Sequence, residues 1–343
     1  MKYSFKNDYA DGAHPRILQA LLDTYEQQEP GYGLDRFSRE ASESIRELIK
    51  NPHASVYFTS GGTQANLTVI SSLLLPFQSV ISAENGHIFT NESGAIESTG
   101  HKVHGIKDKE GKVTVEAVNE LLLQHQNTPH QVEPHLIYLS NSTELGTVYS
   151  REELSKLYEF AKEKGLKIFI DGARLAQALT AKDCDYELYE MAQLCDAFYM
   201  GGTKNGALLG EAVVFTKKEL GENFPFHLKQ KGALLAKGRV LGIQFRELLR
   251  DNLYFELGAQ ANEKAQLIAA ELKNKGVSFL TSSTTNQIFP LLSNWQLERL
   301  EEKFDFYRWK KIQSDLWAAR LICSWASSKK SIDAIIEEIR NWP

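Results

Sequence analysis

Short apolar runs alternate with helical patterns between residues 55 and 215, and this alternation restricts the fold more than any other feature of the sequence. Helix periodicity marks residues 16–25, 40–49, 63–75 and 151–164, the last with Ser150 as N-cap and Gly165 after its end. The expected strands are residues 55–58, 79–82, 136–139, 167–170, 197–200 and 212–215. This order predicts an α/β fold with a mostly parallel sheet and helices on both faces.

The pattern of predicted elements changes after about residue 245. Charged helices are expected at residues 262–275 and 329–340, with short strands near 277–280 and 320–323. We therefore expect a large domain over residues 1–245, which includes the N-terminal segment, and a smaller C-terminal α/β domain over residues 246–343. No Pro- or Ser-rich linker separates them, so a helix is expected to be shared at the junction.

Charge and cysteine content exclude several classes of function. The chain has 39 basic and 44 acidic residues, a net charge of −5 that would not attract nucleic acid or a membrane surface. The three cysteines lack a C-x-x-C spacing, and His101 and His104 have no thiol or carboxylate at ligand spacing, so no metal site is expected. With no apolar signal region at the N-terminus, the sequence predicts a cytoplasmic protein.

Chemistry-bearing residues follow the predicted strands. Gly61, Gly62 and Thr63 join a strand to a helix, where backbone N–H groups bind phosphate, although such a glycine turn is also common in purely structural roles. Asp171 ends an apolar run three residues before Arg174. It either caps the next helix or pairs with a cationic ring nitrogen of a cofactor.

Lys204 lies in a glycine-flanked loop between two predicted strands. A solvated lysine gains nothing from that position. A lysine that forms an imine needs partial desolvation, which lowers its pKa, and glycines allow a flat cofactor to approach closely. Lys204 is therefore the candidate nucleophile.

The three loops, taken in this order, resemble those of the fold type I enzymes that use pyridoxal 5'-phosphate (PLP). More specifically, the sequence is similar to the threonine aldolase and β-eliminating lyase family, from Phe5-Lys6-Asn7-Asp8-Tyr9 to Arg320-Leu321-Ile322. The resemblance implies a PLP-dependent lyase of amino-acid metabolism in which Lys204 forms the Schiff base. It also implies a homodimer or homotetramer with active sites shared between subunits.

The resemblance assigns a role to individual positions. His87 would stack on the cofactor ring, Asp171 would hold its pyridinium nitrogen, and Lys204, His87 and Asp171 form the catalytic set. Without the resemblance His87 would pass as a loop histidine. The cofactor-binding set is Gly61, Gly62, Thr63, His87, Asp171, Arg174, Thr203, Lys204 and Arg239, with Arg239 reaching the partner's phosphate. The substrate-binding set is Asn7, Tyr32, Arg174 and Arg320, with both arginines on the substrate carboxylate.

Two positions depart from the family pattern. Asn7 stands where family members usually have serine. Many threonine aldolases carry a second active-site histidine after an Asn-Thr pair, and the matching stretch here, Asn141-Ser142-Thr143-Glu144, has none. The base that accepts the β-hydroxyl proton therefore stays open among His87, a phosphate-bound water and Glu92.

The expected activity is that of a low-specificity threonine aldolase, which cleaves L-threonine or L-allo-threonine to glycine and acetaldehyde. A PLP-dependent β-eliminating lyase or aminotransferase is the alternative within the same cofactor class. A nicotinamide-dependent dehydrogenase lacks its glycine fingerprint and leaves Lys204 unexplained. A non-catalytic PLP-binding protein is the remaining alternative.

Overall fold

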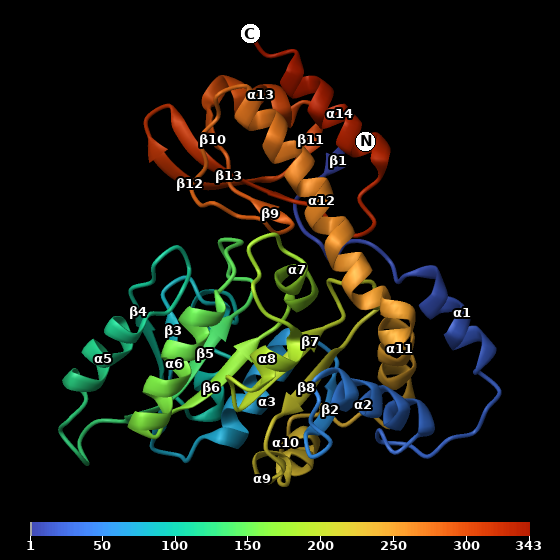
Figure 1. Cartoon of the computed structure of the whole chain (residues 1–343), viewed down its shortest axis with the longest axis vertical. Helices are drawn as coiled ribbons and strands as arrows, with labels where there is room; N and C mark the ends of the chain where they lie inside the picture. The colour runs from blue at the N-terminus through green and yellow to red at the C-terminus, as the bar shows by residue number, and fades with distance from the viewer. Residues whose placement is uncertain (1) are drawn as a thin grey trace.

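A seven-stranded sheet forms the centre of the larger part of the molecule in the computed structural model, which describes residues 2–343 (Figure 1). The strand order is β2-β8-β7-β6-β5-β3-β4, and only β8 runs antiparallel to its neighbours. The strands are β2 (Ser55–Thr59), β3 (Gln78–Ala83), β4 (Val103–Ile106), β5 (Glu133–Ser140), β6 (Lys167–Asp171), β7 (Ala197–Gly201) and β8 (Glu211–Phe215). The predicted mostly parallel sheet is confirmed, although β4 was not expected from the sequence.

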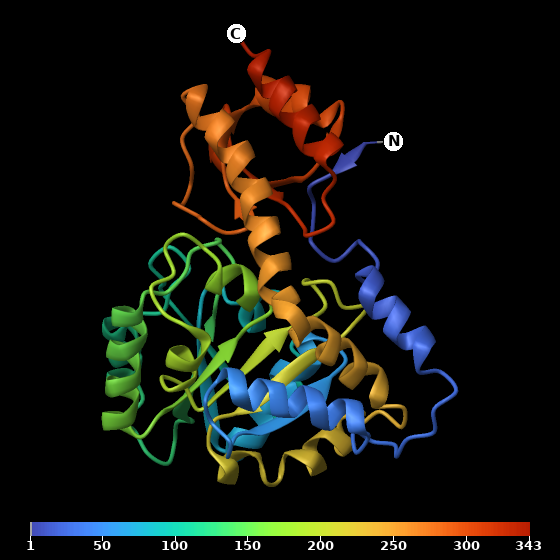
Figure 2. The same cartoon turned by 45° about the vertical axis from the view of Figure 1, so that its right-hand side comes forward.

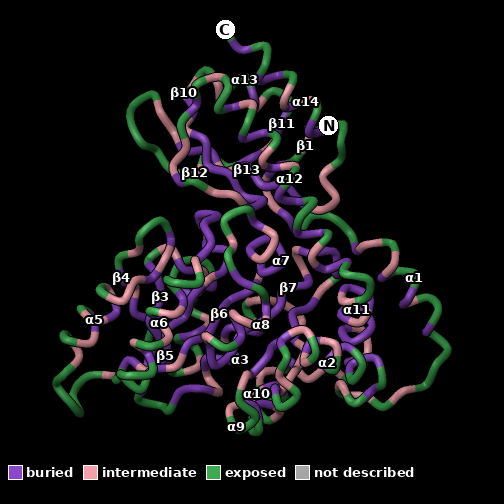
Figure 3. Tube along the Cα trace, viewed as in Figure 1, coloured by how far each residue is buried: buried purple, intermediate pink, exposed green. Residues whose placement is uncertain are grey.

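Helices cover both faces of this sheet because successive strand residues are buried on opposite sides. In β6, Ile168 and Ile170 contribute to one apolar cluster while Phe169 contributes to another. The helices are α1 (Pro15–Asp23), α2 (Arg36–Leu48), α3 (Gly62–Leu73), α4 (His87–Thr90), α5 (Val115–Gln124), α6 (Arg151–Lys164), α7 (Leu175–Leu179), α8 (Leu188–Ala192), α9 (Lys218–Gly221), α10 (Phe224–Gln230) and α11 (Arg239–Leu249), with 3₁₀ turns η1 (Glu97–Thr99) and η2 (Arg250–Asn252). Buried backbone concentrates along the strands between these layers (Figure 3).

Helix α6 shows why the local sequence predicted its ends correctly. The Ser150 hydroxyl accepts a hydrogen bond from the Glu153 N–H, and the Glu153 carboxylate accepts one from the Ser150 N–H. Gly165 follows the helix with a φ of 69°, a conformation that favours glycine.

The smaller part has its own sheet and core. Strands β10 (Leu291–Ser293), β13 (Leu316–Ile322) and β12 (Tyr307–Gln313) are antiparallel, β9 (Gln287–Ile288) pairs with β13, and helices α13 (Asn294–Glu301) and α14 (Lys329–Arg340) pack beside them. The expected strand at 277–280 was wrong: Phe279 makes only an isolated bridge to Pro290. The Val277 N–H bonds back to Leu272 O at the end of α12, which leaves only the bonds of Ser278 and Leu280 with Leu291 and Phe289 around that bridge.

Helix α12 (Leu253–Asn274) joins the two parts (Figures 1 and 2). Its first turns pack in the large core through Leu253 and Leu257, and its last turns pack in the smaller core through Ile268 and Leu272. This is the shared junction helix that the missing linker predicted.

The N-terminal segment contacts both parts. Strand β1 (Tyr3–Ser4) pairs in parallel with β11 (Phe304–Asp305) of the smaller part, and the two labels lie side by side in Figure 1. The domain boundary expected between residues 245 and 246 stays a prediction. That position lies inside α11, and β1, which precedes it in the chain, pairs with β11, which follows it. None of the helices described here combines the length and the apolar composition that crossing a membrane requires.

Candidate active site

A cavity of about 620 Å³ opens at the carboxyl ends of the parallel strands, the edge at which open α/β sheets bind ligands. The smaller part closes it from the other side with Arg320 of β13. Of the residues predicted for the site, those that line it are Asn7, Gly61, Gly62, Thr63, His87, Asp171, Arg174, Thr203, Lys204 and Arg320. Tyr32 and Arg239 do not.

Asp171 is a buried carboxylate held by donors on both oxygens. The Tyr138 hydroxyl and the Asn66 amide donate to Oδ2 at 2.5 and 3.0 Å, and the Tyr199 hydroxyl and the Ala173 N–H donate to Oδ1 at 2.5 and 2.9 Å. Burial by itself would raise the pKa of Asp171, but the nearby His87 and these hydroxyls lower it below its ordinary value. Asp171 is thus an anion at the base of the cavity, available to a cationic ring nitrogen.

His87 begins α4 beside this carboxylate. Its Nδ1 lies 2.8 Å from Oε1 of Glu92, which is buried and also accepts from Asn66 at 2.7 Å. Burial opposes the charged ring, yet the hydrogen bond to Glu92 and the charge of Asp171 raise the pKa of His87 above its ordinary value. His87 therefore favours its protonated form.

Lys204 projects into the same cavity from the loop between β7 and β8. Burial and the charge of Arg174 lower the pKa of Lys204, although Asp8, Asp171 and Glu211 counteract this. A lowered pKa increases the fraction of neutral amine, which is the form that attacks a carbonyl carbon.

A second carboxylate, Glu211, lies next to Lys204 and was not expected from the sequence. It accepts hydrogen bonds from the Gly202 N–H at 3.0 Å and from the Thr203 hydroxyl at 2.8 Å. Burial raises the pKa of Glu211 to about 7, although these donors and Lys204 oppose the shift. Because the Thr203 hydroxyl donates its hydrogen to Glu211, it can only accept a hydrogen bond from a ligand while that bond is present.

The predicted phosphate cradle lies at the N-terminus of α3. Gly61 occupies the N-cap position, and no protein acceptor among residues 2–343 binds the N–H groups of Gly62 and Thr63. A Cβ on Gly62 would meet the Tyr199 hydroxyl at 3.1 Å, so a side chain there would crowd the donors of Asp171. Helix N-termini of this kind bind phosphate through backbone N–H groups and the helix dipole.

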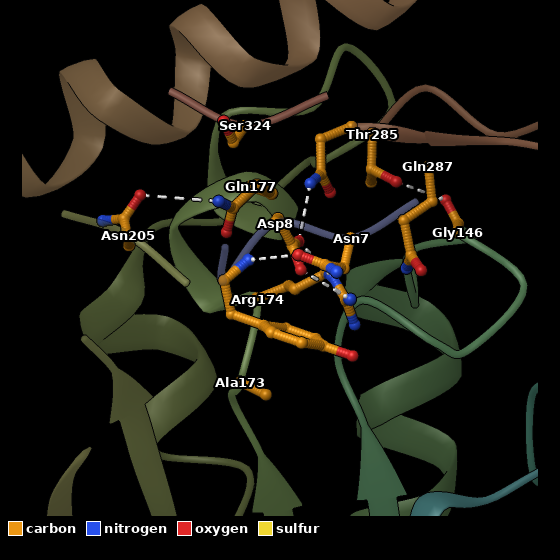
Figure 4. Close-up of polar contacts among 12 residues, drawn as sticks. Asn7, Asp8, Gly146, Ala173, Arg174, Gln177, Asn205, Thr285, Gln287 and Ser324 are labelled. Atoms are coloured by element: carbon orange, nitrogen blue, oxygen red, sulfur yellow. Dashed lines mark hydrogen bonds and ion pairs between the residues drawn. The ribbon is translucent and has the colours of Figure 1, made fainter. Parts of the chain in front are cut away.

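The two predicted carboxylate-binding arginines differ in their surroundings. Arg174 points at Asp8, with Nε 2.7 Å from Oδ2 and Nη2 3.0 Å from Oδ1 (Figure 4). This bidentate pair uses two of the five N–H donors of the guanidinium and leaves those of Nη1 and one of Nη2. Arg174 lines the cavity with part of its guanidinium held by Asp8, and its role toward the substrate carboxylate stays a prediction.

Arg320 has no carboxylate partner among the described residues. Its Nη2 donates to the Gln287 side chain at 2.9 Å, its guanidinium lies 4.8 Å from the ring centroid of Trp309, and its Nε is buried without an acceptor. Burial and the charge of Arg174 lower the pKa of Arg320 to about 10. A guanidinium at the cavity wall that lacks a carboxylate partner is suited to an anionic ligand.

Tyr32 and Arg239 lie away from this cavity. Tyr32 is 49% exposed with a φ of 61°, and the Arg239 guanidinium donates to the backbone oxygens of Thr24 and Gln27. Their expected contribution, Tyr32 to substrate binding and Arg239 to the phosphate in the site of a neighbouring subunit, stays a prediction.

No group of histidine, cysteine, aspartate or glutamate side chains within residues 2–343 is arranged to hold a metal ion. The residues present instead fit PLP: a lysine, an ionised buried carboxylate and a glycine cradle with free N–H groups converge on one cavity. Lys204 would carry this cofactor, Asp171 would pair with its ring nitrogen, and the N-terminus of α3 would bind its phosphate.

Comparison with known proteins agrees with this donor set. The family model described as "Beta-eliminating lyase" matches residues 11–294. The chain belongs to this family. Like the resemblance in its sequence, membership identifies a PLP-dependent lyase.

This β-eliminating lyase family member has relatives that match over nearly all of its length. It is 32% identical to a low specificity L-threonine aldolase of Pseudomonas sp., covering 98% of this chain and 96% of the relative. A solved structure of a Leishmania major threonine aldolase shares 42% identity with a TM-score of 0.96, covering 98% of both chains. An aspartate aminotransferase of Thermus thermophilus, 15% identical with a TM-score of 0.71 and covering 98% of this chain and 90% of that one, shares the fold.

The residues that sequence reasoning missed give weak sequence signals. Tyr138 and Tyr199 stand within apolar strands and look like ordinary core aromatics. Glu144 lines the cavity but stands out in the sequence only as the place of an absent histidine. Glu211 is the first residue of β8, and a polar residue at the start of a strand is common and gives no functional signal.

Proposed function

We propose that this family member is a low-specificity threonine aldolase, which cleaves L-threonine and L-allo-threonine to glycine and acetaldehyde. The observation that carries the proposal is the convergence of Lys204, ionised Asp171 and Arg320, which has no carboxylate partner among residues 2–343, on one cavity. The names of the Pseudomonas and Leishmania relatives supply the substrate class.

Each of these residues has a physical role in the proposed reaction. Lys204, with its lowered pKa, supplies the neutral amine that carries the cofactor through a Schiff base. Asp171 holds a proton on the ring nitrogen, and the cofactor, when bound, withdraws the electron pair released at Cα. Arg320, assisted by the remaining N–H groups of Arg174, would hold the substrate carboxylate, and Asn7 lines the same cavity.

The carboxylate grip determines which bond breaks. With the amino group held near Lys204, a carboxylate held at Arg320 fixes the rotation about the N–Cα bond of the substrate. The rotation that presents the Cα–Cβ bond for cleavage is the one that an aldolase must select.

We also propose that the enzyme is a cytoplasmic homodimer or homotetramer with shared active sites. Tyr32 lines a second cavity of about 530 Å³ that lies near Arg239 and has many apolar lining residues. Tyr32 and Arg239 would extend from this side of the molecule toward the cavity of a neighbouring subunit.

The test is an absorbance spectrum of the purified protein, followed by addition of each threonine isomer and assay of glycine and acetaldehyde. We expect a visible absorbance band and both products. Lys204→Ala is expected to lose the band and the products while retaining its circular dichroism spectrum. A keto acid as product would instead favour β-elimination or transamination, and a colourless wild type that takes up no added PLP would refute the proposal.

A further inference from the structure

One carboxylate at the cavity wall has no role in the site described above. Glu144 lies in the loop after β5, and its Oε1 accepts hydrogen bonds from the Ser140 hydroxyl at 2.6 Å and from the His87 backbone N–H at 2.8 Å. No side chain among residues 2–343 donates to its other oxygen, Oε2. Two hydrogen bonds thus hold Oε1 of Glu144 in place, while Oε2 is free to accept a hydrogen bond or a proton from a ligand.

The other candidate bases of the cavity are less suited to accepting a proton. His87 is bonded to Glu92, and its raised pKa keeps a proton on the ring. Glu92 itself is buried behind His87 and does not line the cavity. The proposed function assigns Asp171 to the ring nitrogen of the cofactor, and Glu211 accepts hydrogen bonds from the Lys204 loop.

We propose that Glu144 is the catalytic base that accepts the β-hydroxyl proton of the amino-acid substrate, an inference that rests on the proposed aldolase function. As Oε2 takes the proton, the electron pair of the O–H bond forms the carbonyl bond of the aldehyde. The Cα–Cβ bond breaks, and its electron pair stays with the glycine fragment, whose Cα later takes up a proton. Atoms and charge balance without any oxidant or reductant.

The surroundings of Glu144 adjust its basicity. Burial, with the charge of Asp171, raises the pKa of Glu144, while the Ser140 hydroxyl and His87 oppose the shift. A carboxylate of raised pKa is a stronger base than an exposed one. The titratable and charged groups whose electrostatic effect couples to Glu144 are His87, Tyr138, Tyr149, Asp171, Arg174 and Arg320.

The deciding variant is Glu144→Gln, because the amide oxygen can still accept from Ser140 and from the His87 N–H. Loss of a general base should lower kcat/KM for L-threonine by about 10²–10⁴-fold. Glycine formation requires protonation of Cα, so the wild type should exchange the Cα proton of glycine with D₂O, a reaction that needs no β-hydroxyl. We expect this exchange, followed by proton NMR, to stay within about threefold of wild type in Glu144→Gln.

Two further measurements separate a base from a structural residue. In the cofactor-free protein, carbon NMR of labelled glutamate should show a carboxyl that titrates above the ordinary glutamate range and is missing in Glu144→Gln. Ser140→Ala removes a donor that lowers the pKa of Glu144, so the acid limb of kcat/KM for threonine should move to higher pH. Glu144→Asp, which withdraws the carboxylate by one methylene, should give an intermediate loss.

The outcomes distinguish this inference from the proposed function. If the wild type releases no glycine and acetaldehyde from threonine, the aldolase proposal fails. If the wild type does so and Glu144→Gln cleaves threonine equally fast, only the base is misassigned. Equal loss of threonine cleavage and glycine exchange, or an acid limb unmoved in Ser140→Ala, would also overturn the assignment of Glu144.

Discussion

Replacement of Asp8 by alanine should be among the most destabilising single changes in the chain. The Asp8 side chain is fully buried and accepts three hydrogen bonds, two from Arg174 at 2.7 and 3.0 Å and one from Asn286 at 2.9 Å. Asp8→Ala leaves the guanidinium of Arg174 buried without its counter-charge. Breaking a buried pair by removing one partner costs about 3–5 kcal/mol, and we expect the free energy of unfolding to fall by that amount.

The assay is urea denaturation of the cofactor-free protein, with the free energy extrapolated to zero denaturant. Asp333→Ala is the matched control, because Asp333 forms an exposed pair with Lys329 at 2.6 Å. Exposed helical pairs contribute about 0.3–0.5 kcal/mol. A loss for Asp8→Ala as small as that of the control would refute the argument that this pair ties the N-terminal segment to the site.

The same pair predicts how stability depends on pH. Burial would raise the pKa of Asp8, but the charge and hydrogen bonds of Arg174 lower it below its ordinary value. The stabilisation is therefore complete above the unfolded pKa of about 3.9 and is lost as pH falls through the lower folded pKa. The stability advantage of wild type over Asp8→Asn should shrink in that acid range and stay constant above it.

Three other predictions concern the cavity. Asp171→Asn should keep the visible absorbance band but lower kcat by roughly 10²-fold, because a neutral amide cannot hold the ring proton; kcat measured beside the spectrum checks this. Arg320→Gln should raise KM for threonine by about 10- to 150-fold, the equivalent of ~1.5–3 kcal/mol for a charge-assisted hydrogen bond, whereas Arg308→Gln, a change at a surface pair with Glu301, should not. In the cofactor-free protein burial raises the pKa of Glu211 to about 7, so the folded state binds a proton that the unfolded state has lost, and stability falls as pH rises from about 4.5 through 7. The free energy of unfolding, measured by urea denaturation across this range, should depend less on pH in Glu211→Gln.

The sequence predicted the parts of the site that chain order controls. Each strand of a parallel sheet ends at the same edge, so residues that follow strands, such as Thr63, Asp171 and Lys204, could be assigned to one cavity from their positions in the chain alone. Glycines beside Lys204 added a conformational signal. The role of Arg320 depended on resemblance, because its strand belongs to another part of the chain.

The sequence could not show which side chains pair across the fold. Asp8 and Arg174 are separated by 166 positions, and nothing local marks them as partners. Nothing in the sequence therefore indicated that Asp8 would bind part of the Arg174 guanidinium. Tyr138 and Tyr199 were missed because a buried tyrosine at a strand position is indistinguishable from core packing until the acceptor of its hydroxyl is known.

The contacts around Asp8 explain how the two parts of the molecule can present one substrate site. Asn286 donates to Asp8 and to the backbone oxygen of Cys323, and the next residue, Gln287, accepts from Arg320. Gln287, the first residue of β9, thus contacts Arg320 of the smaller part, and the preceding Asn286 contacts Asp8, which holds Arg174 of the larger one. If both guanidinium groups bind the substrate carboxylate as proposed, the distance between them would set the position of that carboxylate relative to Lys204. Asn286 and Gln287 would then control the alignment of the reacting bond although neither lines the cavity.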